Sequence, residues 1–422
     1  MRPLRRVFAG ALLALIAGTG AAANTSAPPD TINILVFGDP QPNSVAEVGY
    51  FDRDVVQSAL PMAKDSVVGL SLGDIVNDKP ELYAGVKSAT ERLGVPWLYA
   101  PGNHDIDADA KTDADSLRHF HAAFGDDTRL WKHELANIIV LDDVVAMPGQ
   151  KPAFVGGLRE DQFAQLAKWL PTLPRDRLLV LAVHIPFFDT GESNTFRPAD
   201  RARLFAMLEP FPHVLLLSAH THGQQHYFHD ARTGWQGATP LHEYNVGAAC
   251  GAFWSGVADA QGIPDATMSD GTPNGFATLQ VKRDGAYALA WHPARDPADT
   301  QIALHAPKVL RRGAYPAWGV YANVFMGRED TRVEFRVDGG EWKPMVRVVQ
   351  PDPRVAVENA KDDAADQLRG FNRSPEASPS QHLWRGALPT KIEAGEHTVE
   401  VRAFDAWRGE VRATTRYRLD DA

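Results

Sequence analysis

The sequence predicts an α/β fold followed by a separate all-β domain, and two observations support this prediction. Between residues 31 and 291, apolar runs that end in polar clusters alternate with segments of helical spacing, as in an α/β layered core. From residue 307 onward the pattern is all strand, with alternating apolar and polar residues and turn motifs such as Asp338-Gly339-Gly340. A length of 422 residues also exceeds that of one ordinary domain.

The first region contains five expected strands, each followed by a polar cluster, and five expected helices. The strands are expected at 32–37, 67–72, 97–99, 178–183 and 214–217. The helices are expected at about 51–63, 81–93, 114–124, 159–170 and 197–209. In the fourth helix, Phe163, Leu166 and Leu170 share one face. A hairpin over 275–291, turning at 283–285, completes the region.

A proline-rich stretch separates the two regions. Residues 292–306 contain Pro293 and Pro297, and Pro307 follows them, so we place the domain boundary there. The first domain is expected over 24–300 and a small, sandwich-like β domain over 307–422. Within that second domain, residues 351–380 are polar and rich in Ala, Asp and Pro, and we expect them to form a long loop.

The first 23 residues have the pattern of a signal peptide. Three arginines precede an apolar run over 7–18, and Ala21-Ala22-Ala23 offers a cleavage site before Asn24. The apolar run is about a dozen residues, shorter than the roughly 20 that a spanning helix needs. We therefore expect a periplasmic or secreted protein with no transmembrane segment after cleavage. An uncleaved N-terminal anchor is the alternative.

Composition and charge exclude several classes of protein. Lys and Arg total 43 against 53 Asp and Glu, a net charge of −10, and no stretch is strongly basic. Extended nucleic-acid binding through phosphate neutralisation is therefore not expected. The single cysteine, Cys250, excludes an internal disulfide framework and a CxxC zinc site. Cys250 itself is expected to be a buried small residue.

The polar clusters that follow the expected strands contain the candidate chemistry. They supply two carboxylates, two amides and three imidazoles: Asp39, Gln41, Asp74, Asn103, His184, His220 and His222. Such a donor set suits divalent Mn, Fe or Zn. Seven candidate ligands are too many for one ion and suit two ions that share a bridging carboxylate. Two metals roughly 3.5–4 Å apart can clamp an in-line displacement at phosphorus.

Five ordered blocks of sequence resemble those of the calcineurin-like metallophosphoesterases. They are Gly38-Asp39-Pro40-Gln41, residues 73–78, Gly102-Asn103-His104-Asp105, His184 and Ala219-His220-Thr221-His222. Residues 247–256 and 270–275 further resemble the bacterial exported branch that carries a C-terminal β domain. The resemblance implies a layered β-sandwich core flanked by helices, a small C-terminal β domain, and hydrolysis of phosphate esters at two metal ions.

The resemblance also implies a role for each residue of these blocks. The bridging ligand would be Asp74; the first metal would take Asp39, Gln41 and His222; the second would take Asn103, His184 and His220. It further implies that His104 protonates the leaving alkoxide, with Asp105 orienting its imidazole. Many relatives have a histidine at Gln41, which is either a weaker ligand or a hydrogen-bonding neighbour of the metals. Ala219 replaces the usual glycine before the final His-x-His.

Two aromatic residues are candidates for substrate contact. Phe253 and Trp254 follow an expected core strand in a glycine-rich loop. As an exposed pair they would form one wall of a substrate pocket. Simple packing is the alternative for both.

Together these features predict an exported phosphoesterase that hydrolyses a phosphate mono- or diester by attack of a hydroxide bound at a dinuclear metal centre. Its acidic charge disfavours long polyanions, so a small or envelope-derived phosphoester is the expected substrate. One alternative is a pyrophosphatase acting on a nucleotide-linked substrate. Another is a catalytically inactive metal-binding scaffold that recognises an envelope ligand. The motifs carry no prediction of oligomeric state.

Overall fold

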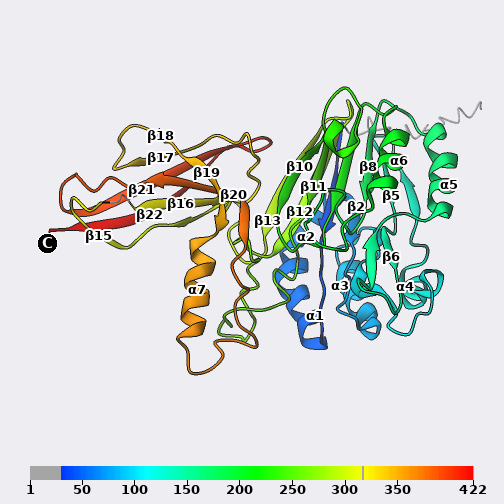
Figure 1. The fold of residues 1–422 in the computed structure, drawn as a ribbon, viewed down its shortest axis with the longest axis horizontal. Coiled ribbons are helices and arrows are strands. Elements are labelled where there is room, and N and C mark those ends of the chain that lie inside the picture. Colours follow the sequence, from blue (N-terminus) through cyan, green and yellow to red (C-terminus); the bar gives the residue numbers. More distant parts are fainter. Residues whose placement is uncertain (1–29, 316–317, 422) are drawn as a thin grey trace, which may run out of the picture. The chain divides into compact units, whose positions relative to one another are not determined.

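Two mixed β-sheets form the core of the first domain in the computed structural model, which describes residues 30–315 and 318–421 (Figure 1). The first sheet has the strand order β13-β12-β1-β2-β3. Its strands are β1 (Thr31–Phe37), β2 (Ser66–Leu72), β3 (Trp97–Ala100), β12 (Gly275–Lys282) and β13 (Tyr287–Pro293). Strands β1, β2 and β3 are parallel, whereas β12 and β13 form an antiparallel hairpin that pairs with β1. The expected hairpin over 275–291 is confirmed.

The second sheet has the order β10-β11-β9-β8-β5-β4. Its strands are β4 (Arg129–Lys132), β5 (Ala136–Val140), β8 (Leu178–Ala182), β9 (Val214–Ser218), β10 (Gln225–His229) and β11 (Leu241–Asn245). The four central strands, β5, β8, β9 and β11, run parallel, and β4 and β10 pair antiparallel at the two edges. A short hairpin of β6 (Val144–Ala146) and β7 (Phe154–Gly156) follows β5.

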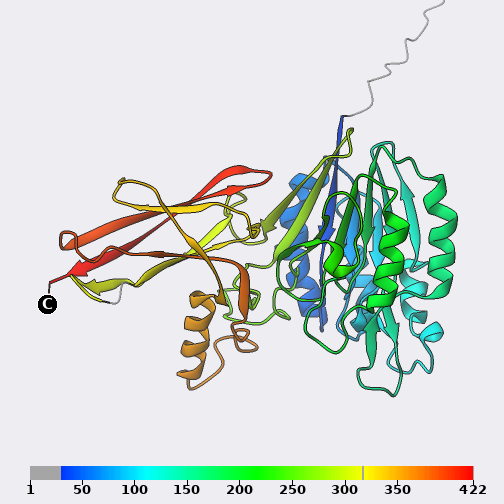
Figure 2. The same ribbon diagram turned by 45° about the horizontal axis from the view of Figure 1, so that its top comes forward.

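Alternating side chains of the second sheet enter two different apolar cores. In β8, Val180 packs in the core that also contains the first sheet, whereas Leu179 and Leu181 pack in a second core beneath α5 and α6. This alternation follows from the two-residue period of a strand, which sends successive side chains to opposite faces. Both faces of the sheet are therefore buried, with helices on its outer side (Figure 2). The predicted layered β-sandwich core flanked by helices is confirmed.

The helices lie close to the predicted positions. They are α1 (Val45–Phe51), α2 (Gln57–Ala63), α3 (Tyr83–Glu91), α4 (Arg118–Phe124), α5 (Glu160–Trp169) and α6 (Pro198–Leu208). The helix predicted from 51 begins earlier, because Ser44 caps α1 by accepting the Glu47 amide. A π-helical turn, η1 (Asp52–Val56), joins α1 to α2. The remaining helical turns are η2 (Pro80–Leu82), η3 (Asn103–Asp105), η4 (Asp113–Asp115), η5 (Leu170–Thr172) and η6 (Ala231–Thr233).

The C-terminal region consists of two further sheets around one apolar core. One has the order β14-β16-β20-β19 and the other β15-β22-β21-β17-β18. Their bounds are β14 (Ile302–His305), β15 (Val309–Arg311), β16 (Gly319–Val324), β17 (Val333–Val337), β18 (Lys343–Pro344), β19 (Val346–Pro351), β20 (Pro379–Ala387), β21 (Gly395–Asp405) and β22 (Gly409–Asp420). Because β14 pairs with β16, this sheet begins before residue 307.

The prediction of a long loop over 351–380 is wrong, since the segment contains a helix. Helix α7 (Pro353–Asp363) begins after Asp352, whose side chain accepts the Arg354 amide. Proline at the first helical position and a capping aspartate are both start signals for a helix. The helix buries only Val355, and its sequence is mostly polar. That polar composition explains why the segment reads as a loop.

Among residues 30–315 and 318–421, no helix is both long and apolar enough to cross a membrane. The predicted signal peptide, residues 1–23, lies outside the residues that the structure describes.

Candidate metal centre

The predicted ligands come from the carboxyl ends of strands in both sheets. In the first sheet, Asp39 follows β1, Asp74 follows β2 and Asn103 follows β3. In the second, His184 follows β8, and His220 with His222 follows β9. Parallel strands present their carboxyl ends at the same edge, so each sheet gathers its own polar residues there. The two sheets together bring the whole set to one end of the sandwich.

Several of these residues have a left-handed backbone, which is uncommon for residues other than glycine. Positive φ angles occur at five predicted ligands: Asp39, Gln41, Asp74, His220 and His222. Asp78, in the loop after β2, and Phe253 and Trp254, in the loop after β11, share this feature. Each such residue costs of order 1–3 kcal/mol, and strain of this kind concentrates at functional sites. The sharp turns that aim the ligands are thus made largely by the ligands themselves.

The glycines before these ligands serve mainly to allow close approach. Of the three, only Gly73 has a positive φ, of 92°. A Cβ at Gly73 would lie 2.5 Å from Nδ1 of His184, and one at Gly102 would lie 2.3 Å from Oδ1 of Asp74. At Gly38 the nearest atom would be the Gly247 carbonyl oxygen at 3.0 Å. Close packing, rather than a turn, therefore requires glycine before Asn103.

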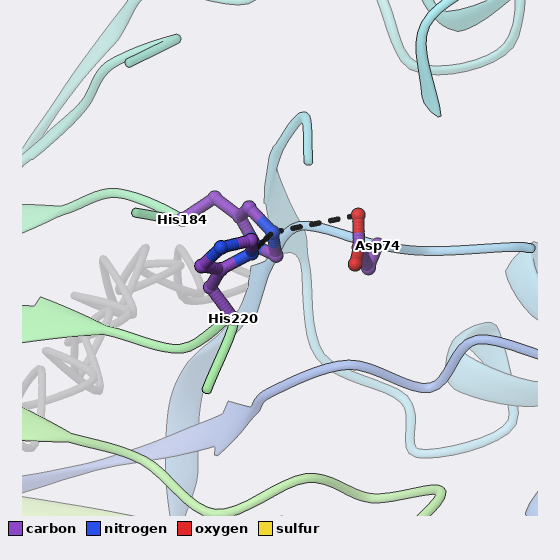
Figure 3. Close-up of side chains that lie close together, drawn as sticks. All are labelled: Asp74, His184 and His220. Atoms are coloured by element: carbon purple, nitrogen blue, oxygen red, sulfur yellow. Dashed lines mark hydrogen bonds and ion pairs between the residues drawn. The ribbon is translucent and has the colours of Figure 1, made fainter. Parts of the chain in front are cut away.

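The ligand atoms form two groups that share Asp74. One group is Asp74, His184 and His220, and the other is Asp39, Asp74 and His222; within each, the ligand atoms lie within 4.8 Å of one another. Nε2 of His184 is 3.4 Å from Oδ1 of Asp74 and 3.1 Å from Nδ1 of His220 (Figure 3). Nε2 of His222 is 3.8 Å from Oδ1 of Asp39. This arrangement fits two metal ions with Asp74 between them.

The histidines are held in the form that binds metals. Nδ1 of His184 donates to the Leu72 carbonyl at 2.8 Å, and Nδ1 of His222 donates to the Gly251 carbonyl at 2.8 Å. In both rings Nε2 is left unprotonated and directed toward the carboxylates. Burial lowers the pKa of His184 to about 3 and that of His220 and His222 to about 4. Neutral imidazoles are the form that coordinates a cation.

The carboxylates carry negative charge that the protein itself does not balance. Asp39 and Asp74 are buried, and no arginine or lysine of the described chain forms an ion pair with either. Burial raises the pKa of Asp39 well above its ordinary value, and the charge of Asp74 raises it further. Burial also raises the pKa of Asp74. Buried charges are stable when they are paired or bind metals, so this donor set fits divalent cations.

The two amides adjoin the same centre. Oδ1 of Asn103 lies 3.1 Å from Nε2 of His184, so this oxygen faces the group formed by Asp74, His184 and His220. Nε2 of Gln41 donates to Oδ2 of Asp74 at 3.3 Å and to Oδ1 of Asn77 at 3.4 Å. An amide nitrogen does not coordinate a metal, so Gln41 would serve as a ligand only through Oε1.

The imidazole of His104 lies beside the centre, but its partner is not the predicted one. Nδ1 of His104 contacts Oδ1 of Asp78 at 3.0 Å, whereas Asp105 is buried and does not touch the ring. The oxygens of Asp105 instead accept from the Gly102 amide at 2.8 Å, the Ile75 amide at 3.1 Å and the Tyr83 hydroxyl at 3.0 Å. Burial raises the pKa of Asp105 to about 7. The expectation that Asp105 orients His104 is therefore wrong. Asp105 holds the loops after β2 and β3 together.

Three buried residues that support the ligands were not predicted from the sequence. Oδ1 of Asp143 accepts the His184 amide at 3.0 Å, and Nδ2 of Asn245 donates to the Ala219 carbonyl. Oε1 of Glu243 accepts the Ser218 hydroxyl at 2.6 Å at the end of β9. Asp143 follows β5 and Asn245 ends β11, and that position is the one signal by which these two could have been found. Glu243 lies in the middle of β11 and offers no such signal.

The two candidate aromatic residues have different surroundings. The Phe253 ring is 57% exposed and stacks on His222, with 4.4 Å between ring centroids. Trp254 is buried, and its Nε1 donates to the Pro40 carbonyl at 3.0 Å. Trp254 therefore does not form a pocket wall but supports the loop between Asp39 and Gln41. Cys250 is buried as expected, with Sγ 3.8 Å from Oε1 of Gln41.

Comparison with protein families gives two adjoining matches. The family model described as calcineurin-like phosphoesterase matches residues 32–224, which include every predicted ligand. The model described as the C terminal of calcineurin-like phosphoesterase matches residues 243–410. Together the two matches span most of the chain. The protein belongs to the calcineurin-like phosphoesterases.

Solved structures include distant neighbours. A dimetal phosphatase from Danio rerio is 12% identical, with 61% of this chain and 98% of that chain covered and a TM-score of 0.41. A purple acid phosphatase from yellow lupin (Lupinus luteus) seeds is 13% identical, with 63% of this chain and 52% of that chain covered and a TM-score of 0.45. A search of proteins of curated function gives no match. Family membership and the two metal-fitting groups make this chain a metal-dependent phosphoesterase.

Proposed function

We propose that this protein hydrolyses a phosphate mono- or diester at a dinuclear centre held by the seven predicted ligands. The observation that carries the proposal is the pair of metal-fitting groups that share Asp74. Asp39, Gln41 and His222 would hold one ion, and Asn103, His184 and His220 the other. The donor set favours Mn, Fe or Zn. Two such ions supply positive charge for the phosphate oxygens and lower the pKa of a water molecule.

The protein's own acid in this reaction is His104. Its side chain is 29% exposed, so an ester oxygen can reach it. Nδ1 faces Asp78, which leaves Nε2 to carry the proton given to the leaving alkoxide. The His104 amide donates to Oδ1 of Asp74 at 2.8 Å, which fixes the acid next to the carboxylate that both metal-fitting groups share. Asp78 is the positioning residue for this imidazole.

We further propose that the protein is exported to the periplasm or secreted, with cleavage after Ala23. The arginines before the apolar run, the length of that run and the three alanines support export. Phe253, exposed beside His222, would contact the substrate.

The test uses protein that lacks residues 1–23 and has been stripped of metal. Hydrolysis of p-nitrophenyl phosphate and of bis(p-nitrophenyl) phosphate is measured before and after Mn²⁺ is added. We expect activity that depends on Mn²⁺, and the ratio of the two rates assigns the ester class. Folded, metal-loaded protein that cleaves neither compound would contradict the proposal and favour a binding scaffold.

A further inference from the structure

A cavity of about 700 Å³ opens directly beside the candidate metal centre. His220 lines it, so the cavity adjoins one of the two metal-fitting groups. The catalytic domain contributes the segment 188–192 and strand β10, and the C-terminal region contributes Ser378 and Gln381. Its volume is within the range of ligand pockets, about 300–1,000 Å³. The space is much larger than a phosphate group requires, so it can hold the alcohol portion of an ester.

This cavity continues into a second one of about 770 Å³. Gln225, Tyr227 and Gln381 line both, so the two form one groove that leads away from the metal centre. Arg232, Arg328 and Arg347 line its far part. The groove therefore suits an extended group rather than a compact one.

The groove is rich in uncharged hydrogen-bonding groups. Near the centre its lining consists mostly of hydroxyls and amides: Thr190, Thr221, Gln224, Gln225, Ser269, Ser378 and Gln381. The side-chain amide of Gln225 has no hydrogen-bond partner within the described parts of the chain. Such groups match a ligand that carries many hydroxyls, each able to donate and accept.

An aromatic surface lies where the two cavities meet. The ring of Tyr227 stacks on Phe188, with 5.2 Å between centroids and 20° between planes. In the far part, Phe228 is 39% exposed and the guanidinium of Arg328 lies 5.5 Å from its ring centroid. Flat aromatic rings beside hydroxyls and amides can pack against the C–H face of a sugar ring while its hydroxyls are hydrogen-bonded.

The charges of the groove near the metal centre disfavour a polyanionic ligand. Asp189 and Glu192 line the near part, which has no lysine or arginine among its lining residues in the described chain. A polyphosphate chain would be repelled there. The far part is lined by three arginines and three carboxylates, with Arg232 paired to Asp230 and Arg328 paired to Asp330. Its charges therefore balance and select neither an anion nor a cation.

We infer that the groove binds a glycosyl group, so that the substrate is a phosphate ester of a sugar or glycan. This inference rests on the proposed phosphoesterase activity and names its substrate class. Tyr227 provides the stacking surface, and Gln225 and Gln381 hydrogen-bond to sugar hydroxyls. Because Gln381 belongs to β20, the C-terminal domain contributes directly to substrate binding.

The test compares matched esters that differ only in the alcohol. One set contains the 6-phosphates of glucose, mannose, galactose and N-acetylglucosamine, with butyl phosphate and phosphocholine as references. A second set contains the p-nitrophenyl diesters of the same alcohols. We expect kcat/KM for at least one sugar ester to exceed that for the butyl ester about tenfold or more, equivalent to about 1.4 kcal/mol.

Substitutions locate the effect in the groove. Tyr227→Ala and Gln381→Ala should lower kcat/KM for the preferred sugar ester several-fold more than for the butyl ester, chiefly through KM. Tyr227→Phe keeps the stacking ring and should retain the sugar preference. Tyr321→Ala and Gln350→Ala, half-buried positions outside the groove, are the matched controls and should leave both rates unchanged.

The outcomes separate this inference from the proposed function. Failure to hydrolyse p-nitrophenyl phosphate and its bis-ester means that the phosphoesterase proposal itself fails. Hydrolysis of those compounds without preference for any sugar ester over the butyl ester overturns the glycosyl inference alone. A preference for the choline esters overturns it in favour of a cationic ligand.

Discussion

Charged side chains are arranged in opposite ways at the metal centre and in the C-terminal sheet β15-β22-β21-β17-β18. At the centre, Asp39 and Asp74 are buried together without a basic partner. On strands β17 and β21, by contrast, Arg336 pairs with Glu400 and Arg402 pairs with Glu334, each at 2.7 Å and partly exposed. Trp342 lies beneath both guanidinium groups, at 4.5 and 4.2 Å.

This contrast separates a region organised for chemistry from one organised for stability. The sheet that contains β17 and β21 lowers its energy by pairing these opposite charges locally. The centre instead maintains strained backbone at its ligands and uncompensated carboxylates. Buried charge without a partner destabilises a fold, so it is retained where a cation or a reaction needs it. The two regions should therefore respond to mutation in opposite ways.

The largest expected effect is at Asp74, the carboxylate that the two metal-fitting groups share. Asp74→Asn should lower kcat about 10³-fold, because the metal ions contribute several kcal/mol of transition-state stabilisation. Metal content, measured by plasma mass spectrometry, should fall in parallel. In metal-free protein the same substitution should raise the thermal midpoint, since it removes one of two buried like charges. A metal-free variant less stable than wild type would show that the carboxylates are structurally balanced after all.

The next largest effects are expected at His104, the proposed acid, and at Asp78, which positions its ring; the two should differ in size. His104→Ala should reduce hydrolysis of an alkyl phosphate about 10²–10⁴-fold, because the alkoxide leaves without a proton. Asp78→Asn, which weakens only the orientation of the ring, should have a smaller effect, about tenfold. Both effects should shrink for p-nitrophenyl esters, whose leaving group needs no proton.

That dependence on the leaving group identifies the role of Asp78. A purely structural defect would reduce hydrolysis of alkyl and aryl esters equally. Glu209→Gln, at an exposed position just after α6 and outside the groove, provides the control for loss of a carboxylate and should show no such dependence.

The motif blocks predicted the centre because its ligands directly follow buried strands. Asp39, Asp74 and His184 each come within two residues of a strand end, so their approximate position depends only on sheet topology. The partner of His104 was not predictable in this way. Whether Asp78 or Asp105 reaches the ring depends on loop conformation, here on the left-handed backbone of Asp78 and on the burial of Asp105.

Residues that act through packing were the hardest to predict from sequence. Trp254 and Phe253 are adjacent and chemically alike, yet one is buried beneath Pro40 and the other is exposed on His222. The groove beside the centre was equally hidden, because it combines Tyr227 with Gln381, which are far apart in the chain. Helix α7 was missed although its capping signals were present, since it buries a single side chain.

In the C-terminal sheet that contains β17 and β21, a substitution should affect stability slightly and activity not at all. Glu400→Gln should lower the free energy of unfolding by up to about 1 kcal/mol, because the pair with Arg336 is partly exposed and screened by solvent. Urea unfolding measures this change, and kcat should equal that of wild type. Glu341→Gln, an exposed glutamate without an ion pair among the described residues, is the matched control. A several-fold fall in kcat would contradict the separation of the two regions.

The smallest expected effect is a pH dependence at the end of the β17–β21 pair in the same sheet. Nδ1 of His397 contacts Oδ2 of Asp338 at 2.6 Å. Burial opposes the charged form of His397, but the hydrogen bonds to Asp338 and to the Glu393 carbonyl outweigh it and raise its pKa. For Asp338, burial acts upward, but the hydrogen bond from His397 outweighs it and lowers the pKa.

The directions of these two shifts define a pH window. The contribution of His397 is complete below its unfolded pKa of 6.5 and is lost as pH rises through the higher folded value. That of Asp338 is present above its unfolded pKa of 3.8 and is lost as pH falls through the lower folded value. The thermal midpoint of wild type should therefore exceed that of His397→Gln by more at pH 5 than at pH 8. An equal difference at both values would mean that the contact stabilises by packing, and that charge in this sheet matters less than the comparison with the metal centre implies.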